Sequence, residues 1–382
     1  MTVRNGLYLT AALLLLLAYC HSPKPGGDST HDQWALLGFV KADRINPILS
    51  PGKGIFEDPV THRKIAWEAR NVFNPAMVVR HDTAFMLYRA QDSSLTSRIG
   101  LAWSTDGLHF TRFAQPVFYP SPDAFFNLEW PGGCEDPRVT EDAAGNYYMT
   151  YTAYDGKTAR LCVAYSPDLL HWTKSGPAFA KAYDGRYRDA WSKSGSIVSE
   201  YTADGHIRAV KLGGYYWMYW GDQNIWIARS ADLLHWEPLT MKPGEHPPVP
   251  LKGQALHMPD LQIAVPTRAG KFDADLVESG PPAILTKTGI LLIYNSRNLR
   301  AEGDTSLPDG TYTAGQVWMD PQHPEKILDR LDHNFLHPDQ PYELAGEVNR
   351  VCFAEGLIRF KHQWFLYYGT ADSKIAVAVK NE

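Results

Sequence analysis

Short runs of aromatic and aliphatic residues recur along the chain, each preceded by a polar or glycine-containing turn. Five of these runs end in an aromatic residue, and their ends are separated by 63, 69, 74 and 74 residues. Runs of this length and composition are typical of β-strands, and their regular recurrence indicates a repeated unit. The runs are residues 85–88, 147–151, 215–220, 290–294 and 364–368.

A second pattern has alanine, serine, aspartate, leucine, histidine and an aromatic residue at fixed offsets. Its copies are residues 102–110, 164–172 and 228–236, and their starts are 62 and 64 residues apart. Each copy predicts a strand that ends at the serine, followed by a turn that carries the aspartate. Because all three copies repeat it, the aspartate (Asp106, Asp168 or Asp232) is interpreted as structural.

Together the two repeats predict an all-β fold, a five-bladed β-propeller with a central active-site pocket, built by residues 35–382 as one domain. Each four-stranded blade would cover the faces of its neighbours, because a small sheet cannot bury both faces alone. Residues 241–276 and 299–309 lengthen two of the intervals and are rich in proline, glycine or charge. We expect them to form loops at the mouth of the pocket.

The N-terminus has a different pattern. Residues 1–20 combine a basic start with an apolar run too short to span a bilayer comfortably, which predicts a signal peptide. Residues 17–20 resemble a bacterial lipoprotein cleavage box, in which Cys20 carries the lipid; a plain secreted protein is the alternative. Residues 21–34 predict a flexible tether. We therefore expect an exported protein of the periplasm or outer membrane, attached to a membrane only through Cys20.

Composition and charge narrow the partners. The formal net charge is −5 and the basic residues are scattered, so the basic footprint of a nucleic-acid binder is missing and a weakly charged ligand is favoured. Beyond Cys20, the three cysteines Cys134, Cys162 and Cys352 have no spacing typical of a metal site or a disulfide framework. They predict small buried side chains. No metal or cofactor is expected, and the oligomeric state stays open.

Polar residues near the starts of the innermost strands would face the centre of a propeller. Four of the five segments upstream of the aromatic runs carry an acid among apolar residues. Burying several carboxylates together is costly unless they are paired or used. Their convergence predicts a glycosidase, in which one acid protonates the leaving oxygen and one carboxylate activates water or attacks. The candidates are Asn74, Glu135, Asp136, Arg138, Lys193, Glu278 and Glu355 upstream of the runs, and Arg89, Asp222, Asn295 and Asp372 after them.

The order of these motifs resembles glycoside hydrolase family 130, the mannoside phosphorylases and mannosidases. The likeness covers nearly the whole mature chain and rests on Asn74-Pro, Tyr88-Arg-Ala, Glu135-Asp-Pro-Arg138, Gly280-Pro-Pro282, Gly315-Gln-Val, Asp320-Pro and Tyr368-Gly-Thr-Ala-Asp372.

The resemblance implies a single-displacement inversion at a β-mannosidic bond of a manno-oligosaccharide, with Asp136 as the general acid. It also implies that Asn74, Arg89, Arg138 and Asp372 hold the terminal mannose. Substrate binding is assigned as well to Glu135, Lys193, Asn295 and Glu355.

One departure from the family pattern favours water over phosphate as the attacking group. The phosphorylases carry Tyr-His-Gly where this chain has Tyr294-Asn-Ser, and Asn295 cannot supply the positive charge that helps to bind phosphate. Glu278 and Asp222 are expected near the same rim, where carboxylates repel phosphate and activate water. The pattern resembles the exported, hydrolytic branch of β-1,2-mannosidases. It predicts an inverting exo-β-mannosidase in which Glu278, with Asp222, is the base.

Three alternatives stay open. Lys193 and Arg297 are cations that a β-mannoside phosphorylase could use to bind inorganic phosphate. A propeller glycosidase of the arabinanase or fructosidase type would also draw acids from several blades. A non-catalytic glycan-binding propeller would show the same convergence of polar residues.

Overall fold

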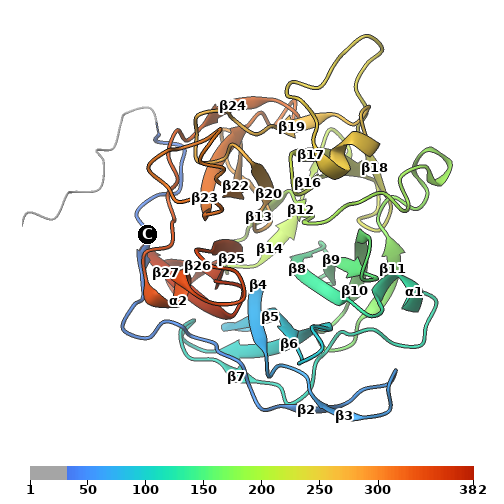
Figure 1. Cartoon of the computed structure of the whole chain (residues 1–382), viewed down its shortest axis with the longest axis vertical. Helices are drawn as coiled ribbons and strands as arrows, with labels where there is room; N and C mark the ends of the chain where they lie inside the picture. Colours follow the sequence, from blue (N-terminus) through green and yellow to red (C-terminus); the bar gives the residue numbers. More distant parts are fainter. Residues whose placement is uncertain (1–31) are drawn as a thin grey trace, which may run out of the picture. The chain divides into compact units, whose positions relative to one another are not determined.

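The computed structural model describes residues 32–382. The predicted signal peptide, the candidate lipidation site Cys20 and residues 21–31 of the predicted tether lie outside the described residues. From Trp34 to Glu382 the chain forms one compact unit. Figure 1 shows that β-strands make up almost all of its regular structure, so the all-β prediction is confirmed.

Helices are limited to single turns within residues 32–382. They are α1 (Phe126–Glu129), α2 (Pro341–Leu344) and the 3-10 turns Ala182–Gly185 and Gly253–His257. None of these described helices is long and apolar enough to cross a membrane. The strands therefore build the core and position the site.

Strands that follow one another in the chain pair in antiparallel groups. Group A contains β4 (Asn71–Arg80), β5 (Thr83–Gln91), β6 (Ser97–Ser104) and β7 (Thr111–Arg112). Group B contains β8 (Gly133–Glu141), β9 (Tyr147–Tyr154), β10 (Ala159–Ser166) and β11 (Thr173–Pro177). Group C contains β12 (Ser196–Ile197), β16 (Tyr215–Trp220), β17 (Ile225–Ser230) and β18 (Trp236–Pro238).

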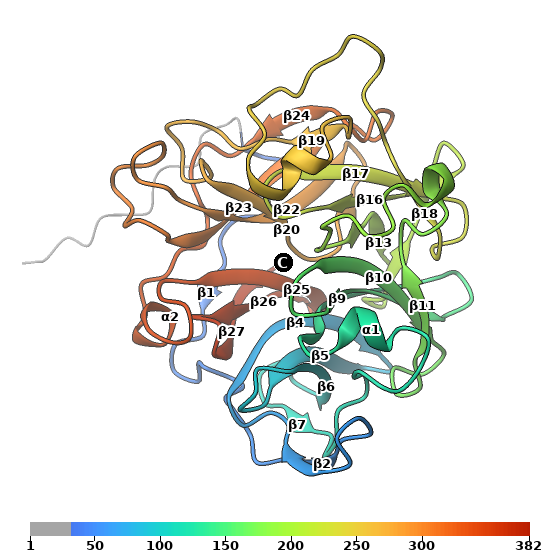
Figure 2. The same ribbon diagram turned by 45° about the vertical axis from the view of Figure 1, so that its right-hand side comes forward.

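Other strand pairs form two further groups. Group D contains β20 (Leu276–Ser279) and β21 (Ile284–Leu285), which both pair with β22 (Ile290–Arg297), then β23 (Tyr312–Met319) and β24 (Ile327–Arg330). Group E contains β25 (Cys352–Phe360), β26 (Gln363–Thr370), β27 (Lys374–Asn381) and the N-terminal β1 (Val40–Lys41). Figures 1 and 2 show the groups around a common centre, with the first strand of each nearest to it.

The five predicted aromatic runs are confirmed as strands. They lie in β5, β9, β16, β22 and β26, which each pair directly with an inner strand. Most of their residues are buried on both faces, as in the stretch from Phe365 to Thr370. A strand covered on both faces reads as a continuous apolar run, and this is why the runs are visible in the sequence.

Apolar clusters lie between neighbouring groups. Each contains large side chains from two groups, which pack at close range and exclude water from both sheet faces. The pairs include Leu87 with Tyr151 between A and B, Val163 with Trp220 between B and C, Ile227 with Leu292 between C and D, Ile293 with Leu366 between D and E, and Phe365 with Met86 between E and A. The last group therefore packs against the first.

A hairpin links groups that are not neighbours in sequence. It consists of β13 (Ser199–Tyr201) and β14 (Ile207–Ala209). β13 pairs in parallel with β21 of group D, and β14 pairs in parallel with β8 of group B. The Tyr201 hydroxyl also donates to the Leu357 carbonyl of group E.

The aspartates of the second repeat close turns, as predicted. In the first copy the Asp106 carboxylate accepts from the backbone N–H of His109 at 2.8 Å, and its other oxygen lies 2.8 Å from His109 Nδ1. The Ser104 hydroxyl accepts from the backbone N–H of Gly107 at 2.9 Å. The copies at Asp168 and Asp232 have the same contacts. These acids are therefore structural.

A buried triad of tyrosine, acid and cation recurs in four groups of the described chain. The tyrosine ends an aromatic run, the acid lies in the segment before the inner strand, and the cation lies on the outermost strand. In group B, for example, the Tyr151 hydroxyl donates to Glu129 at 2.9 Å, and Lys174 Nζ contacts the other oxygen at 2.5 Å. The other triads are Tyr88–Glu68–Arg112, Tyr294–Asp273–Arg330 and Tyr368–Glu343–Lys41.

Group C has an aromatic cluster in place of the triad. Trp220 packs against Phe179 and Trp226, with ring centroids 4.6 and 5.1 Å away. The neighbouring Tyr219 donates instead to the Pro324 carbonyl at 2.7 Å. The three cysteines of the described region are free and buried, as predicted.

Candidate active site

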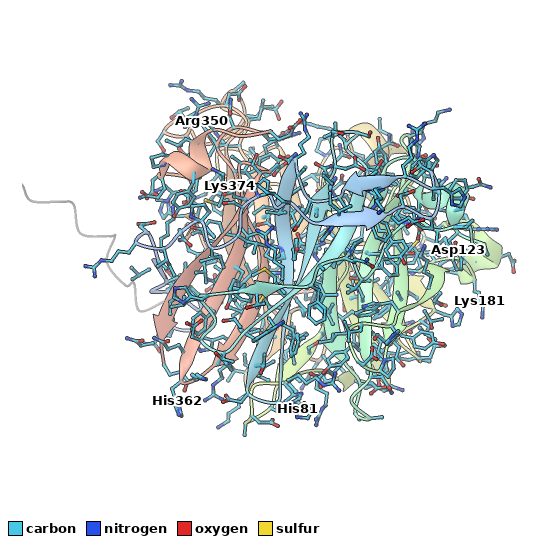
Figure 3. All side chains as sticks on the ribbon, turned by 90° about the horizontal axis from the view of Figure 1, so that it is seen from below. His81, Asp123, Lys181, Arg350, His362 and Lys374 are labelled. Atoms are coloured by element: carbon cyan, nitrogen blue, oxygen red, sulfur yellow. The ribbon has the colours of Figure 1, made fainter. Side chains whose placement is uncertain are left out.

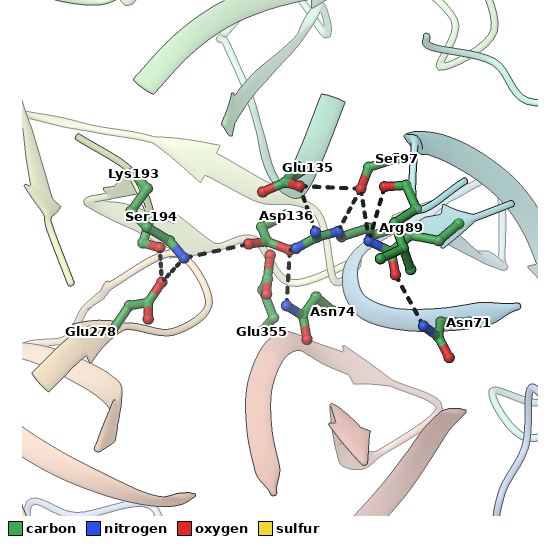
Figure 4. A network of polar contacts seen from close by, with 12 residues as sticks. Asn71, Asn74, Arg89, Ser97, Glu135, Asp136, Lys193, Ser194, Glu278 and Glu355 are labelled. Atoms are coloured by element: carbon green, nitrogen blue, oxygen red, sulfur yellow. Dashed lines mark hydrogen bonds and ion pairs between the residues drawn. The ribbon is translucent and has the colours of Figure 1, made fainter. Parts of the chain in front are cut away.

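Irregular backbone at the strand starts directs polar side chains to the centre. The register shifts by a residue or two in β4 at Asn74, in β8 at Asp136 and in β25 at Glu355. Such bulges re-aim a side chain that regular pairing would send elsewhere. Asn74 and Asp136 have positive φ values of 49° and 48°, and Ser194 and Asp372 have values of 59° and 50°. Figure 4 shows Asn74, Asp136 and Glu355 side by side.

Asp136 is the hub of this cluster and is almost fully buried. Its carboxylate accepts from Asn74 Nδ2 at 2.9 Å and from Arg89 Nη1 at 3.0 Å, and Lys193 Nζ lies 3.8 Å from its second oxygen. Burial alone would raise the pKa of Asp136, but Arg89, Lys193 and Arg138 outweigh it and hold the pKa well below its ordinary value. Without substrate, Asp136 is therefore a carboxylate.

Arg89 joins Asp136 to Glu135. Its Nη2 donates to Glu135 at 2.5 Å and its Nε donates to the Ser97 hydroxyl at 3.0 Å. The guanidinium also lies over the Phe73 ring, 4.6 Å from its centroid. Burial raises the pKa of Glu135, although Arg89 opposes the shift. The pKa values of the two adjacent acids are thus shifted in opposite directions, because the cations favour ionisation of Asp136 more strongly.

Lys193 connects Asp136 to Glu278. Its Nζ lies 3.2 Å from Glu278 Oε1, and the same oxygen accepts from the Ser194 hydroxyl. Burial raises the pKa of Glu278, which Lys193 only partly offsets. Lys193 Nζ contacts one oxygen of each acid, so the distance between these two oxygens is at most the sum of the two contact distances. This upper limit lies near the lower end of the roughly 6.5–9.5 Å that typically separates the two carboxyl groups of an inverting glycosidase.

Arg138 and Glu355 form a buried pair next to Asp136. Arg138 Nη1 is 3.1 Å from Glu355 Oε1, and both side chains are buried. The guanidinium also donates to three carbonyls, those of Asp136, Ser279 and Gly280. Burial raises the pKa of Glu355 well above its ordinary value.

Asn295 is fully buried, and its amide is used by the backbone. Nδ2 donates to the Ala354 carbonyl at 2.9 Å, and Oδ1 accepts from the Ala354 N–H at 2.7 Å. Cα register places it opposite Glu278. The amide therefore fixes the residue before Glu355 and adds no charge.

Two predicted acids complete the arrangement. Asp222 is partly exposed and accepts from the Trp191 indole at 3.0 Å. Burial raises the pKa of Asp372 to about 6, against the effect of Arg89, and Asp136 adds to the rise. All eleven predicted site residues are thus in or beside one charged cluster, with Asp222 at its edge.

A family model described as beta-1,4-mannooligosaccharide phosphorylase, for glycoside hydrolase family 130, matches residues 41–382. The chain belongs to glycoside hydrolase family 130. The resemblance noted in the sequence is thereby confirmed, and the chain is a member of a family of enzymes that act on β-mannosides.

Relatives of this family 130 chain include both phosphorylases and hydrolases. It is 28% identical over 324 residues to a 1,2-beta-oligomannan phosphorylase of Thermoanaerobacter sp. strain X514, covering 82% of this chain and 90% of the relative. A solved structure of a Bacteroides thetaiotaomicron protein is 45% identical, with a TM-score of 0.85 and coverage of 91% of this chain and 98% of that protein. Another structure belongs to work on family 130 hydrolases that target β-1,2 mannosidic linkages in Candida mannan; it is 41% identical, with a TM-score of 0.85 and coverage of 91% and 95%.

Several residues of the family 130 cluster were not predicted. Ser97 and Ser194 contact the acids through their hydroxyls. Tyr312 accepts from Arg297 at 3.3 Å, and burial raises its pKa, with Glu278 and Asp372 adding to the shift. Ser194 lies in a segment that the sequence did single out. Tyr312 is the first residue of β23, and neither sequence repeat includes this position.

Lys193 and Arg89 are partly exposed cations of the family 130 cluster. Their side chains are 20% and 14% exposed, whereas Asp136 and Glu278 are 2% and 4% exposed. Asp222 and Asp372 are partly exposed as well. Figure 3 shows Arg350, which precedes β25, and Lys374, which follows Asp372, on the face opposite the turns that carry His81 and His362. A ligand that approaches the inner-strand starts would therefore meet these two cations and two acids before it reached Asp136 and Glu278.

The two long insertions contact each other beside Asp222. The backbone N–H of Ala255 donates to the Gln223 side chain at 3.2 Å, and Lys252 pairs with Glu302 at 2.7 Å.

A separate groove of about 570 Å³ is lined by residues of 117–125 and 170–174, and none of the predicted site residues lines it. Residues 32–382 contain no group of three or more potential ligands arranged to hold a metal ion.

Proposed function

We propose that this family 130 protein is an inverting exo-β-mannosidase that hydrolyses β-1,2-linked manno-oligosaccharides. The observation that carries the proposal is Asn295. It is buried and uncharged, and its amide is used by Ala354; the family resemblance implies that it stands where the phosphorylases carry a histidine. A phosphate bound beside Asn295 would lie near Glu278, whose carboxylate would repel it.

We propose that groups A to E are the five blades of a β-propeller. The support is the packing of each group against two neighbours and of the last group against the first. Similar structures at 41 and 45% identity fit this architecture. The radial arrangement is what gathers short segments from several blades into one cluster.

In the proposed reaction Glu278 deprotonates water and Asp136 delivers the proton to the leaving oxygen. A raised pKa makes Glu278 a stronger base than an ordinary glutamate. Asp136 is ionised in the ligand-free cluster, so it must gain a proton once the sugar is bound. Glu355, Glu135 and Asp372, whose pKa values are raised, are neighbouring acids that retain protons more readily than Asp136. Asp222 would orient the water beside Glu278.

We propose export to the periplasm or outer membrane, with Cys20 as the lipid anchor. Phosphorolysis conserves energy as a sugar phosphate, which is useful where that product is metabolised. Outside the inner membrane, water is the effective acceptor. This reasoning supports hydrolysis independently of Asn295.

The phosphorylase function is the second candidate because the curated relative from Thermoanaerobacter is a phosphorylase. Lys193 and Arg297 are the cations available for phosphate. Lys193 is already paired with Asp136 and Glu278, and Arg297 is paired with Asp275. These pairs favour hydrolysis, since a phosphate would have to displace carboxylates from both cations.

The deciding experiment supplies β-1,2-mannobiose with and without inorganic phosphate and separates mannose from mannose 1-phosphate. We expect free mannose at the same rate in both conditions. Asp136→Asn should lower kcat by at least about 10²-fold, the usual contribution of general acid catalysis. Phosphate-dependent release of mannose 1-phosphate would establish the phosphorylase instead. Absence of turnover with any mannoside, together with retained binding, would favour a glycan-binding protein.

A further inference from the structure

Arg138 connects the backbones that carry the two central carboxylates. It lies two residues after Asp136 in β8, and its side chain is 1% exposed. Its Nη1 donates to the Asp136 carbonyl at 3.2 Å, and its Nη2 donates to the Ser279 carbonyl at 2.7 Å. Ser279 follows Glu278 directly. One guanidinium therefore joins the Asp136 backbone of group B to the residue after Glu278 in group D.

The donors of Arg138 are almost all occupied. A guanidinium has five N–H groups in a rigid plane. Nε donates to the Gly280 carbonyl at 2.9 Å, and Nη1 also faces Glu355 at 3.1 Å, in addition to the two carbonyls above. Three of the five N–H groups are therefore bonded to carbonyls, and a fourth faces Glu355 without a hydrogen bond. The geometry disfavours a sugar-holding role, although the family resemblance implies one.

Glu355 is the acid that faces the Arg138 guanidinium, with Oε1 3.1 Å from Nη1. Burial raises the pKa of Glu355 well above its ordinary value, and the buried cation limits that rise. Asn295 in turn fixes Ala354, the residue before Glu355, through both of its amide atoms. The guanidinium is thus held in place by groups D and E while it donates to the Asp136 carbonyl.

We propose that Arg138 is a positioning residue that sets the separation of the Asp136 and Glu278 carboxylates. The proposal rests on the proposed function, in which these two residues are the acid and the base. An inverting enzyme must keep room for one water molecule between its base and the anomeric carbon. A displacement of about 1 Å in such a pair can cost about 10²-fold in rate.

The first test is Arg138→Lys, which keeps the charge but cannot bridge the three carbonyls. We expect kcat on β-1,2-mannobiose to fall by about 10²-fold, with KM and the Kd for mannose changing by less than about 3-fold. The limbs of the pH–rate profile should stay in place, because the charge is kept. Arg330→Lys is the matched control: Arg330 is also buried and bonded to a carboxylate and a carbonyl, but lies outside the cluster. It should lower Tm without lowering kcat.

The second test displaces the other end of the connection and changes no charged residue. A Cβ at Gly280 would lie 2.8 Å from the Ile293 carbonyl oxygen and 3.0 Å from that of Ala354, so Gly280→Ala must shift the backbone that Arg138 binds. We expect a fall in kcat without a matching rise in KM. Gly289→Ala, whose Cβ would meet the Trp318 side chain at 2.5 Å, is the control with a similar overlap away from the cluster. This pair of variants decides the question if Arg138→Lys does not fold.

Two results would overturn the proposal. A rise of more than about 10-fold in KM or in the Kd for mannose, with kcat kept, would mean that Arg138 binds the sugar directly. A loss of Tm with kcat kept would mean that the contacts are only structural. If the wild-type enzyme proves to be a phosphorylase, the same measurements run with phosphate present, so the two proposals fail separately.

Discussion

At the residue scale, burial and neighbouring charges shift the pKa values of the central acids in different directions, as Asp136 and Asp372 show. Asp136 is kept ionised by three cations, whereas Asp372, buried beside Arg89 and Asp136, has a pKa raised to about 6. A carboxyl with such a pKa exchanges its proton near neutral pH. Its protonation state therefore changes between mildly acidic and neutral solution.

We predict that stability depends on pH through Asp372. Its ordinary pKa is 3.8, so between about pH 4 and 6 the folded protein keeps a proton that the unfolded chain releases. The free energy of unfolding should fall as pH rises through this window, by up to about 3 kcal/mol at about 1.4 kcal/mol for each pKa unit. Urea titrations at pH 4 and pH 7 would measure this loss against Asp372→Asn, which lacks the titrating group. Equal pH dependence in the two proteins would contradict the prediction.

The sequence predicted which residues meet, but not every contact they make. The acids could be placed because repeated strands put their upstream segments at one centre. Asn295 was expected to face the substrate, and the sequence could not show that a neighbouring strand would use its amide. The bulge at Asp136 was also invisible, since one extra residue cannot be recognised among intervals that already range from 63 to 74 residues.

At the scale of the elements, the buried triads of groups A, B, D and E join the segment before the inner strand to the outermost strand of the same group. The acid and the tyrosine are separated by 20 to 25 residues in the four copies. That spacing is regular enough to be found in the sequence, provided that a buried acid is sought before each inner strand. Neither Glu129 nor Glu343 was singled out, because the search concentrated on the strand starts.

We predict that Tyr151→Phe lowers the free energy of unfolding by about 1.5–3 kcal/mol, because it removes a hydrogen bond to a buried carboxylate. Glu129 would keep only Lys174 as its partner among these groups. Urea unfolding followed by tryptophan fluorescence would measure the change. Tyr165→Phe, on the same sheet but 39% exposed, should be close to neutral. A neutral result for Tyr151→Phe would show that the triad adds nothing to stability.

At the scale of the whole described unit, the N-terminal segment completes the last group. β1 pairs with β27, and Lys41 pairs with the buried Glu343. Trp34 stacks on Trp318 at 5.7 Å, and the Gln316 side chain bonds both backbone polar atoms of Leu36. The two ends of this unit are therefore joined through strand pairing.

We predict that a chain beginning at residue 42 has a lower Tm than one beginning at residue 34. Loss of the Lys41–Glu343 pair alone leaves a buried carboxylate without its cation, at a cost of about 3–5 kcal/mol. We expect a decrease of about 5–10 °C. Differential scanning calorimetry of the two proteins at one concentration would measure it. Equal Tm values for the two proteins would mean that the pairing of β1 with β27 does not stabilise the fold.

The positive φ values at Asn74, Asp136, Ser194 and Asp372 restrict what mutagenesis can achieve in this enzyme. Asparagine and aspartate tolerate the left-handed region, whereas branched and bulky side chains are strained there. A saturation library at these codons would lose many members to misfolding before any reached the assay. Directed evolution of substrate preference would gain more from exposed positions of the insertions, such as Leu256, which is 60% exposed and does not have a positive φ.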